Sequence, residues 1–282
     1  MNAAVQAQRA RQLVLAMIYH AGSGHPGGSL SAIECLLHLY LERLQPGDRF
    51  VLSKGHAAPA LYAVLALTGH IPFAELATFR KLGSRLQGHP SVADLPQVEA
   101  STGSLGQGFS AAIGMALGNR YQGRNNRFYT LLGDGECQEG EVWEGAMFAA
   151  HYRLNHLTAI IDYNKLQSDD RNANILGLEP LRAKWTAFGW HVTEIDGHDW
   201  QAWPKAFEDR QPNQPHLIIA HTLKGKGVSY MEDKPPWHGS VKLNPDELCN
   251  ALRECGCHSE SVEEWLALDI FERLAAVWEV TA

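Results

Sequence analysis

An acidic and an amide side chain follow two apolar stretches of this sequence, in a pattern suited to binding a cation. Asp134 stands between two glycines directly after the apolar residues 128–132, and Asn164 comes shortly after a second apolar run at 157–161. If these runs are neighbouring parallel strands, both side chains emerge at one edge of the sheet. Open parallel sheets bind their ligands at that edge.

The ligand chemistry that these residues favour is a hard divalent cation carrying a diphosphate. The Asp134 carboxylate, the Asn164 amide oxygen and the backbone carbonyl of Leu166 supply three oxygens, the ligand type that Mg²⁺ prefers. Two diphosphate oxygens and a water would complete an octahedron, beside the N-terminus of the following helix. The alternative is an ordinary loop aspartate followed by an asparagine turn.

The composition excludes several classes of protein. The 282 residues carry a net charge of −7 without a long basic run, which argues against nucleic acid or an anionic membrane as main partner. Five scattered cysteines do not form the pattern of a disulfide framework, and no apolar run could span a bilayer. The N-terminal segment lacks a signal-peptide cleavage pattern. We therefore expect a cytoplasmic protein.

Predicted strands alternate with predicted helices along the chain. The strands are expected near residue 50 and at 128–132, 157–161, 190–195 and 216–220. The helices are expected over the N-terminal segment, from a Ser29 or Ser31 cap to about residue 44, and at 73–82, 109–121, 180–188, 199–210, 247–254 and 261–277. This alternation predicts an α/β fold with a doubly wound parallel sheet and helices on both faces.

The expected domain organisation is simple. Residues 83–108 are long and irregular, which is unusual in a compact domain and often functional. No repeat, low-complexity linker or change of composition divides the chain. We expect a single domain over residues 1–282, with C-terminal helices from about residue 244.

The motifs of the sequence resemble those of the transketolase family and occur in transketolase order. They are SGHPGG at 23–28, SKGHA at 53–57, GHP at 88–90, STGSLGQG at 101–108, GDGECQEG at 133–140, DYNKLQ at 162–167, KGKG at 224–227 and WHG at 237–239. The likeness covers about residues 5–245. Ser104, Ser91 and Asp170 depart from residues common in that family, and none of these departures removes a ligand.

The resemblance implies that the diphosphate is thiamine diphosphate and that the fold is of the pyrophosphate-domain type. It implies Mg²⁺ at Asp134, Asn164 and Leu166, for which Ca²⁺ or Mn²⁺ could substitute. Glu139 would lie near a subunit boundary, in a network linking paired active sites. The implied cofactor contacts are His56, Gly103, Ser104, Leu105, Gly133, Asp134, Gly135, Glu139, Asn164 and His238.

Four histidines on separate loops acquire catalytic roles through the same resemblance. His25 and His89 would contact sugar hydroxyls, and His56 and His238 would hydrogen-bond the diphosphate or the substituents of the reacting carbon. Groups that share protons near neutral pH suit such a reaction. Taken singly, each histidine would more often be structural, and the long loop before His238 makes its reach hard to judge.

The resemblance also predicts a partner. After the WHG motif about forty residues remain, too few for a second α/β domain. We expect the N-terminal subunit of a split transketolase, inactive alone and active in an α2β2 assembly with a subunit that carries the pyrimidine-binding domain. Together they would transfer a two-carbon ketol group from a ketose or ketose phosphate to an aldose acceptor.

Alternatives remain at this stage. The chain could be half of another thiamine-diphosphate enzyme, similar to deoxyxylulose-phosphate synthase or to a 2-oxo acid dehydrogenase, or a non-catalytic scaffold subunit. Lys224 and Lys226 are interpreted as solvated loop charges. Cys255, Cys257 and His258 lack the second ligand pair of a zinc site.

Overall fold

The computed structural model describes residues 3–258 and 261–278, and their contacts group into two compact units. Unit 1 comprises residues up to 43, 56–97 and from 223 onward, and unit 2 comprises 44–55 and 98–222. The chain passes from unit 2 to unit 1 within the SKGHA motif, between Gly55 and His56.

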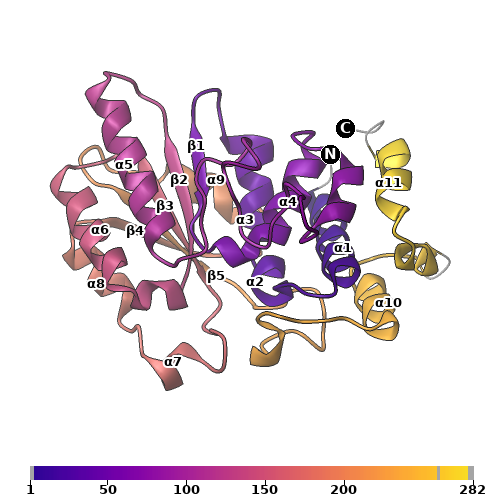
Figure 1. The fold of residues 1–282 in the computed structure, drawn as a ribbon. Coiled ribbons are helices and arrows are strands. Elements are labelled where there is room, and N and C mark those ends of the chain that lie inside the picture. The colour runs from indigo at the N-terminus through magenta and orange to yellow at the C-terminus, as the bar shows by residue number, and fades with distance from the viewer. Residues whose placement is uncertain (1–2, 259–260, 279–282) are drawn as a thin grey trace. The chain divides into compact units, whose positions relative to one another are not determined.

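Unit 2 is built on a five-stranded parallel sheet in the order β1-β2-β3-β5-β4 (Figure 1). The strands are β1 (Arg49–Leu52), β2 (Phe128–Gly133), β3 (Leu157–Tyr163), β4 (His191–Asp196) and β5 (His216–His221). Because β2, β3 and β5 are buried along nearly their whole length, they read in sequence as continuous apolar runs. All five predicted strands are confirmed within one or two residues.

Helices cover both faces of this sheet. They are α5 (Gln107–Tyr121), α6 (Gly140–His151), α8 (Leu181–Ala187) and α9 (Ala202–Glu208), whereas the short helix α7 (Asn172–Ile175) lies in the loop between β3 and α8, away from the sheet. One core joins α5, α6 and α8 to the strands through Phe109, Ala146 and Trp185. On the other face Phe207 of α9 meets Tyr129 of β2, with ring centroids 5.7 Å apart. Successive strand residues point to opposite faces, so the predicted doubly wound sheet is confirmed.

Unit 1 is helical among its described residues. Its helices are α1 (Ala3–Ala21), α2 (Pro26–Leu30), α3 (Ile33–His38), α4 (Ala58–Leu67), α10 (Pro245–Glu254) and α11 (Ile270–Trp278). Helix α1 is central, since it packs against α2, α3, α4 and α10. A side-chain ion pair between Arg11 and Glu34, 2.6 Å apart and largely buried, fastens α1 to α3.

Several predicted helix boundaries are wrong. The helix expected up to residue 44 is divided into α2, α3 and a π-helical turn, Leu39–Arg43. Neither predicted serine caps it, because the Ser29 and Ser31 hydroxyls donate backward to the carbonyls of His25 and Gly28. These bonds satisfy the hydroxyls within the turn instead of at a helix start.

Two further helices are shorter than predicted. Residues 73–82 form only a 3₁₀ turn, Phe73–Thr78. The helix expected at 261–277 is interrupted at Ala267, whose backbone is extended, between a 3₁₀ turn at Glu263–Leu266 and α11. The interruption leaves both Trp265 and Phe271 buried, so side-chain packing outweighs the continuous helical pattern.

Two expectations from the composition are tested directly. All five cysteines are free thiols, as expected. Within the described ranges, no helix has both the length and the apolar character needed to cross a membrane.

Candidate functional site

The carboxyl ends of β2 and β3 bring the predicted cation ligands together in unit 2. Gly133 pairs with Asp162 in the parallel ladder, and the Asp134 backbone N–H donates to the Asp162 carbonyl at 3.3 Å. Asp134 therefore leaves β2 where Asn164 leaves β3. The prediction that the two side chains emerge at one edge of the sheet is confirmed.

Asp134 is a buried carboxylate, only 2% exposed. Its oxygens accept from the backbone N–H groups of Lys165 and, at 2.8 Å, Gly135. The Asn172 amide lies near it and helps to lower its pKa, but makes no hydrogen bond of ordinary geometry. Burial and then the neighbouring Asp162 raise the pKa of Asp134 to about 6. No described cationic side chain forms an ion pair with Asp134, so a bound cation would relieve this charge.

The second acid, Asp162, orients the predicted amide ligand. It accepts from the Lys54 ammonium, the Thr222 hydroxyl and, at 3.1 Å, the Asn164 Nδ2. A carboxylate can only accept, so the Asn164 NH₂ must face Asp162 and Oδ1 must face away. Oδ1 accepts from the Leu166 N–H at 3.1 Å and keeps a second lone pair. Neither Asp162 nor Lys54 was predicted as a site residue, although both lie inside recognised motifs.

Lys165 shapes the turn between the ligands. Its φ of +66° is in the left-handed region, which costs a non-glycine residue about 1–2 kcal/mol. This turn directs the Lys165 N–H to Asp134 and the Leu166 N–H to Asn164. Leu166 itself is buried and forms a bridge with Arg171. The carboxylate, amide and carbonyl oxygens are hard donors and fit a divalent cation.

A further buried acid, Glu136, joins three of the recognised loops. It accepts from the Ser53 hydroxyl, from the Gly106 N–H at 2.9 Å and from the Gly133 N–H at 2.9 Å. Burial raises its pKa, against the effect of these donors. Glu136 was not predicted as a site residue, because its role depends on loops far apart in the sequence.

The loop of the STGSLGQG motif approaches the SKGHA loop closely. A Cβ on Gly55 would lie 2.7 Å from the Thr102 Oγ1 and 2.8 Å from the Gly103 nitrogen. Gly103 and Gly106 have φ of +143° and +87°, which glycine adopts readily. Ser104 is exposed and Leu105 half-buried, so both remain accessible to a ligand. Glu139 is exposed at the start of α6.

The four predicted catalytic histidines cluster in unit 1. The His25 ring centroid lies 5.5 Å from that of His56, 6.1 Å from His89 and 5.8 Å from His238. His56 and His238 are 5.2 Å apart. The structure brings these four loops together within unit 1, including the loop that carries His238.

Backbone bonds explain how the long loop reaches the cluster. Gly24 and Val241 exchange hydrogen bonds of 3.2 and 3.1 Å, and the Gly225 N–H donates to the Gly27 carbonyl at 3.0 Å. Gly239 then packs on the ring of His25, since a Cβ there would lie 2.2 Å from Cδ2. Residues 223–241 are thus held against the SGHPGG loop. These contacts place His238 beside His25.

One interpretation of side-chain charge changes with the structure, that of Lys224. Lys224 is not solvated but 2% exposed, with Nζ 2.7 Å from the His238 Nδ1. Lys226 is partly exposed and lies 4.0 Å from Glu232. Burial, Arg80, His89 and Lys224 lower the pKa of His25 to about 4, and burial and Arg80 lower that of His89. With this pKa, His25 is neutral near pH 7.

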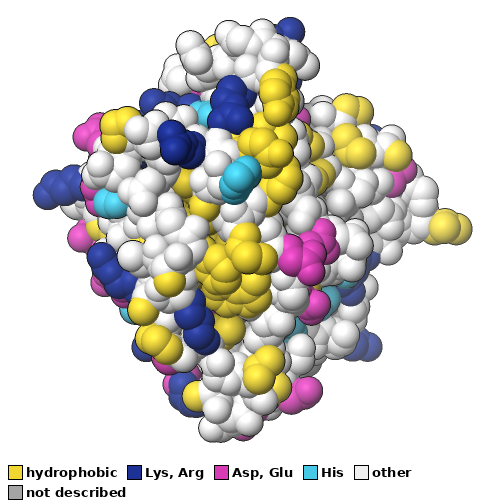
Figure 2. Space-filling view, turned by 90° about the vertical axis from the view of Figure 1, so that its left-hand side faces the viewer, with side chains coloured by type: hydrophobic (Ala, Val, Ile, Leu, Met, Phe, Trp, Pro, Cys, Tyr) yellow, Lys and Arg dark blue, Asp and Glu magenta, His cyan; other side chains and the backbone are white. Residues whose placement is uncertain are grey.

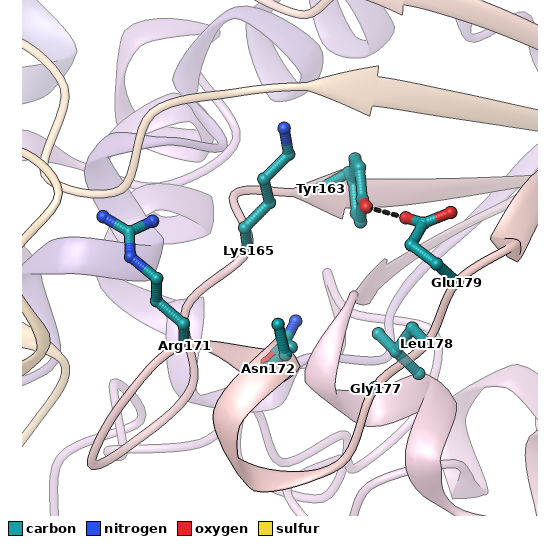
Figure 3. Close-up of a pocket in the computed structure, with 8 residues that line it drawn as sticks. Tyr163, Lys165, Arg171, Asn172, Gly177, Leu178 and Glu179 are labelled. Carbon is teal, nitrogen blue, oxygen red and sulfur yellow. Dashed lines mark hydrogen bonds between the residues drawn. The ribbon is translucent and has the colours of Figure 1, made fainter.

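A pocket of about 480 Å³ adjoins the turn after the cation ligands (Figure 3). It is lined by Tyr163, Lys165, Arg171, Asn172, Ala173, Gly177, Leu178 and Glu179. The Tyr163 hydroxyl donates to the Glu179 carboxylate across one side, and Lys165 and Arg171 lie on the other. The Lys165 backbone N–H donates to Asp134, and Lys165 also lines the pocket. The candidate cation site and the pocket are therefore linked through this residue.

Comparison with known proteins agrees with this geometry. The family model described as the transketolase thiamine diphosphate binding domain matches residues 2–264. The 6-deoxy-6-sulfo-D-fructose transketolase subunit of a Clostridium species is 47% identical over 260 residues, covering 88% of this chain and 94% of that protein. An apulose-4-phosphate transketolase subunit of Phocaeicola vulgatus is 39% identical, covering 92% and 96%.

Longer transketolases match over part of their length. The human enzyme is 44% identical over 78% of this chain but only 36% of its own. The Campylobacter jejuni structure superposes with a TM-score of 0.82 at 30% identity, covering 99% of this chain and 48% of that one. The fold is that of a thiamine diphosphate binding domain. The chain belongs to the transketolase family.

Proposed function

We propose that this chain is the diphosphate- and metal-binding subunit of a two-subunit transketolase, which moves a two-carbon ketol group from a ketose or ketose phosphate to an aldose. The observation that carries the proposal is the buried Asp134, held beside Asn164 and raised in pKa with no described cationic partner. Relatives named as transketolase subunits, matched over nearly their whole length, support an enzyme made of two different chains.

The metal that we propose is Mg²⁺, with Ca²⁺ or Mn²⁺ as substitutes, held by Asp134, Asn164 and the Leu166 carbonyl. Thiamine diphosphate, when bound, supplies the carbon nucleophile of the reaction. Its diphosphate would complete the metal's oxygen ligands, and the backbone of Gly133, Gly135, Gly103, Ser104 and Leu105 would contact it. The exposure of Ser104 and the partial exposure of Gly103 and Leu105 support this assignment.

The histidine cluster would hold the oxygens of the substrate and the cofactor. We assign the sugar hydroxyls to His25 and His89, and the diphosphate or the substituents of the reacting carbon to His56 and His238. Neutral imidazoles can both donate and accept, which suits the recognition of hydroxyl groups. The lowered pKa of His25 and of His89 supports neutral rings at the working pH.

We further propose that the two units act as one cytoplasmic domain over residues 1–282. A single family model spans both units, which supports this view. Inactivity of the chain alone remains part of the proposal, because the partner would carry the pyrimidine-binding domain.

The assembly that we propose is α2β2, with two copies of this chain in contact through α5 and α6. A groove of about 550 Å³ between these helices is lined by Ile113, Gly114, Leu117, Gly145 and Phe148, with Glu141 and Glu144. Figure 2 shows hydrophobic side chains in a hollow on that side of the molecule, with acidic groups beside it. Glu139, which we assign to the subunit boundary, directly precedes α6 and so lies next to one wall of this groove.

The test is a ketol-transfer assay with both subunits and a panel of ketoses, aldoses and 2-oxo acids. Ketol transfer that needs both subunits and fails with Asp134→Ala supports the proposal. Decarboxylation of pyruvate without ketol transfer would establish a 2-oxo acid enzyme instead. Unchanged binding of thiamine diphosphate and Mg²⁺ by Asp134→Ala in calorimetry would favour a scaffold subunit.

A further inference from the structure

Two residues of unit 1, Arg80 and Gly239, contact the His25 ring. Arg80 places Nη2 3.3 Å from the His25 Nδ1 and Nη1 2.7 Å from the Ser23 hydroxyl oxygen. Gly239 also packs on the ring, since a Cβ there would lie 2.2 Å from the His25 Cδ2. A guanidinium has five donors and no acceptor, so Nδ1 must accept and the ring proton must lie on Nε2.

Arg80 is itself firmly placed. Its φ is +59°, and its backbone N–H donates to the Leu86 carbonyl at 2.9 Å. The guanidinium lies over the Phe79 ring, 5.6 Å from the centroid. A Cβ on Gly88 would lie 2.8 Å from the Arg80 Nε, so the glycine of the GHP motif provides the space for this guanidinium.

His238 has a matching arrangement with the buried Lys224. The Lys224 Nζ lies 2.7 Å from the His238 Nδ1. An ammonium has three donors and no acceptor, so this ring also carries its proton on Nε2 when neutral. Gly27 packs on the lysine stem, since a Cβ there would lie 3.1 Å from Cγ and 3.2 Å from Cε. The backbone of residue 224 also accepts from the Asp233 N–H at 3.0 Å.

We propose that Arg80 and Lys224 are positioning residues that hold His25 and His238 in the Nε2–H tautomer, so that both rings present N–H donors to ligand oxygens. The tautomers follow from the donor geometry alone, whereas the identity of those oxygens rests on the proposed function. Each histidine would then stabilise negative charge on a bound oxygen by donating a hydrogen bond.

The charges around the histidine cluster also favour a neutral His25 ring. The groups that face His25 are His56, His89, His238, Arg80 and Lys224. Burial contributes most to lowering the pKa of His25, and Arg80, His89 and Lys224 lower it further. Arg80 and Lys224 therefore contribute the positive charge beside the ring, while His25 stays a neutral donor.

The tautomers can be measured in the purified full chain by NMR after ¹⁵N labelling of histidine rings. At pH 7 we expect the nitrogen shifts and couplings of His25 and His238 to report a proton on Nε2 only. Assignments come from His25→Asn and His238→Asn. A proton on Nδ1 of either ring in the unmodified chain would overturn the proposal for that ring, whatever the variants do.

Variants test the cause of the tautomer. Arg80→Gln should convert His25 to a mixture of tautomers and raise its pKa, and Lys224→Gln should convert His238 to a mixture of tautomers. Lys81→Gln and Lys226→Gln, which change exposed or partly exposed charges on the same segments, should leave both rings unchanged. Unaltered tautomers in correctly folded Arg80→Gln and Lys224→Gln would overturn the proposal. Where either does not fold, the tautomer measured in the unmodified chain tests the proposal by itself.

A kinetic comparison in the presence of the partner chain separates positioning from simple packing. Loss of a residue that orients a catalytic group typically costs about 10- to 100-fold in activity, and we expect that loss in kcat/KM for Arg80→Gln. Arg80→Lys should recover only part of the lost kcat/KM. One ammonium cannot reach both Ser23 and His25, as the two Nη atoms of the guanidinium do. Correct tautomers in a chain without ketol transfer would refute the proposed function and leave this inference standing.

Discussion

Asn164 donates from Nδ2 to the Asp162 carboxylate at 3.1 Å, and this bond turns its amide oxygen toward the side on which a cation would bind. Asp162 is in turn held by the Lys54 ammonium, both side chains being about 1% exposed. The candidate ligand Asn164 is therefore oriented by a buried ion pair whose two members are not among the proposed ligands.

Asp162→Asn should weaken binding of Mg²⁺ with thiamine diphosphate by about 10- to 100-fold, the usual cost of removing a residue that orients a ligand. It should also lower the free energy of unfolding by about 3–5 kcal/mol, because Lys54 stays buried without its partner. Calorimetry and urea unfolding measure the two effects. Asp169→Asn, at an exposed position on the same loop, is the matched control.

The double variant Asp162→Asn/Lys54→Met distinguishes these effects. Replacing both charges should recover most of the stability, since no buried ion is left unpaired. Metal affinity should stay low, because the amide of Asn164 is still released. Recovery of affinity together with stability would show that Asp162 acts only through folding.

The stability of the metal-free chain should depend on the protonation of Asp134. Its pKa of about 6 in the folded chain exceeds the ordinary value of 3.8, so the folded state binds the proton more tightly. Stability should therefore rise as pH falls from about 7 toward 4, by an amount on the order of 1–3 kcal/mol. Asp134→Asn should be more stable than the unmodified chain at pH 7 and lose this advantage at pH 4.

Urea unfolding of both chains without metal at several pH values measures this dependence. The difference between their free energies of unfolding removes the contribution of the other titratable groups, Glu136 included. Bound metal should reverse the trend, since the cation requires the ionised carboxylate. A constant stability difference between the two chains from pH 4 to pH 7 would contradict the raised pKa.

Gly239→Ala should abolish the fit between the WHG loop and His25. A Cβ would lie 2.2 Å from the His25 Cδ2 and 2.4 Å from Nε2, a distance that forces the ring or the loop to move. We expect kcat/KM of the two-subunit enzyme to fall by about 10-fold or more, as for other lost positioning contacts. Gly118→Ala in α5 is the control, because open space surrounds that position.

Phe148→Glu should weaken the proposed contact between two copies of this chain. Phe148 is 41% exposed, so little folding energy depends on it, but a carboxylate in the α5–α6 groove would add to Glu141 and Glu144. Sedimentation of the complex with its partner should show a shift from α2β2 toward αβ. Tyr121→Glu, at the end of α5 and outside the groove, should leave the mass unchanged.

The sequence by itself determined the parallel sheet and the first ligands of the site. The strands are buried on both faces, so their apolar runs stand out, and the glycines beside Asp134 mark a turn at the end of a strand. The order of the motifs indicated which of the histidine-bearing loops belong to the site. These signals are local, so they can be recognised without knowledge of the fold.

Only the tertiary structure decided what each charge near the site does. Lys224 reads as a solvated loop residue until the Gly225–Gly27 bond and the packing of Gly27 bury it against His238. The roles of Asp162, Glu136 and Arg80 likewise depend on partners tens of residues away. A side chain's burial and hydrogen-bond partners are set by which distant segments pack on it, and no periodicity or spacing in the sequence encodes that contact.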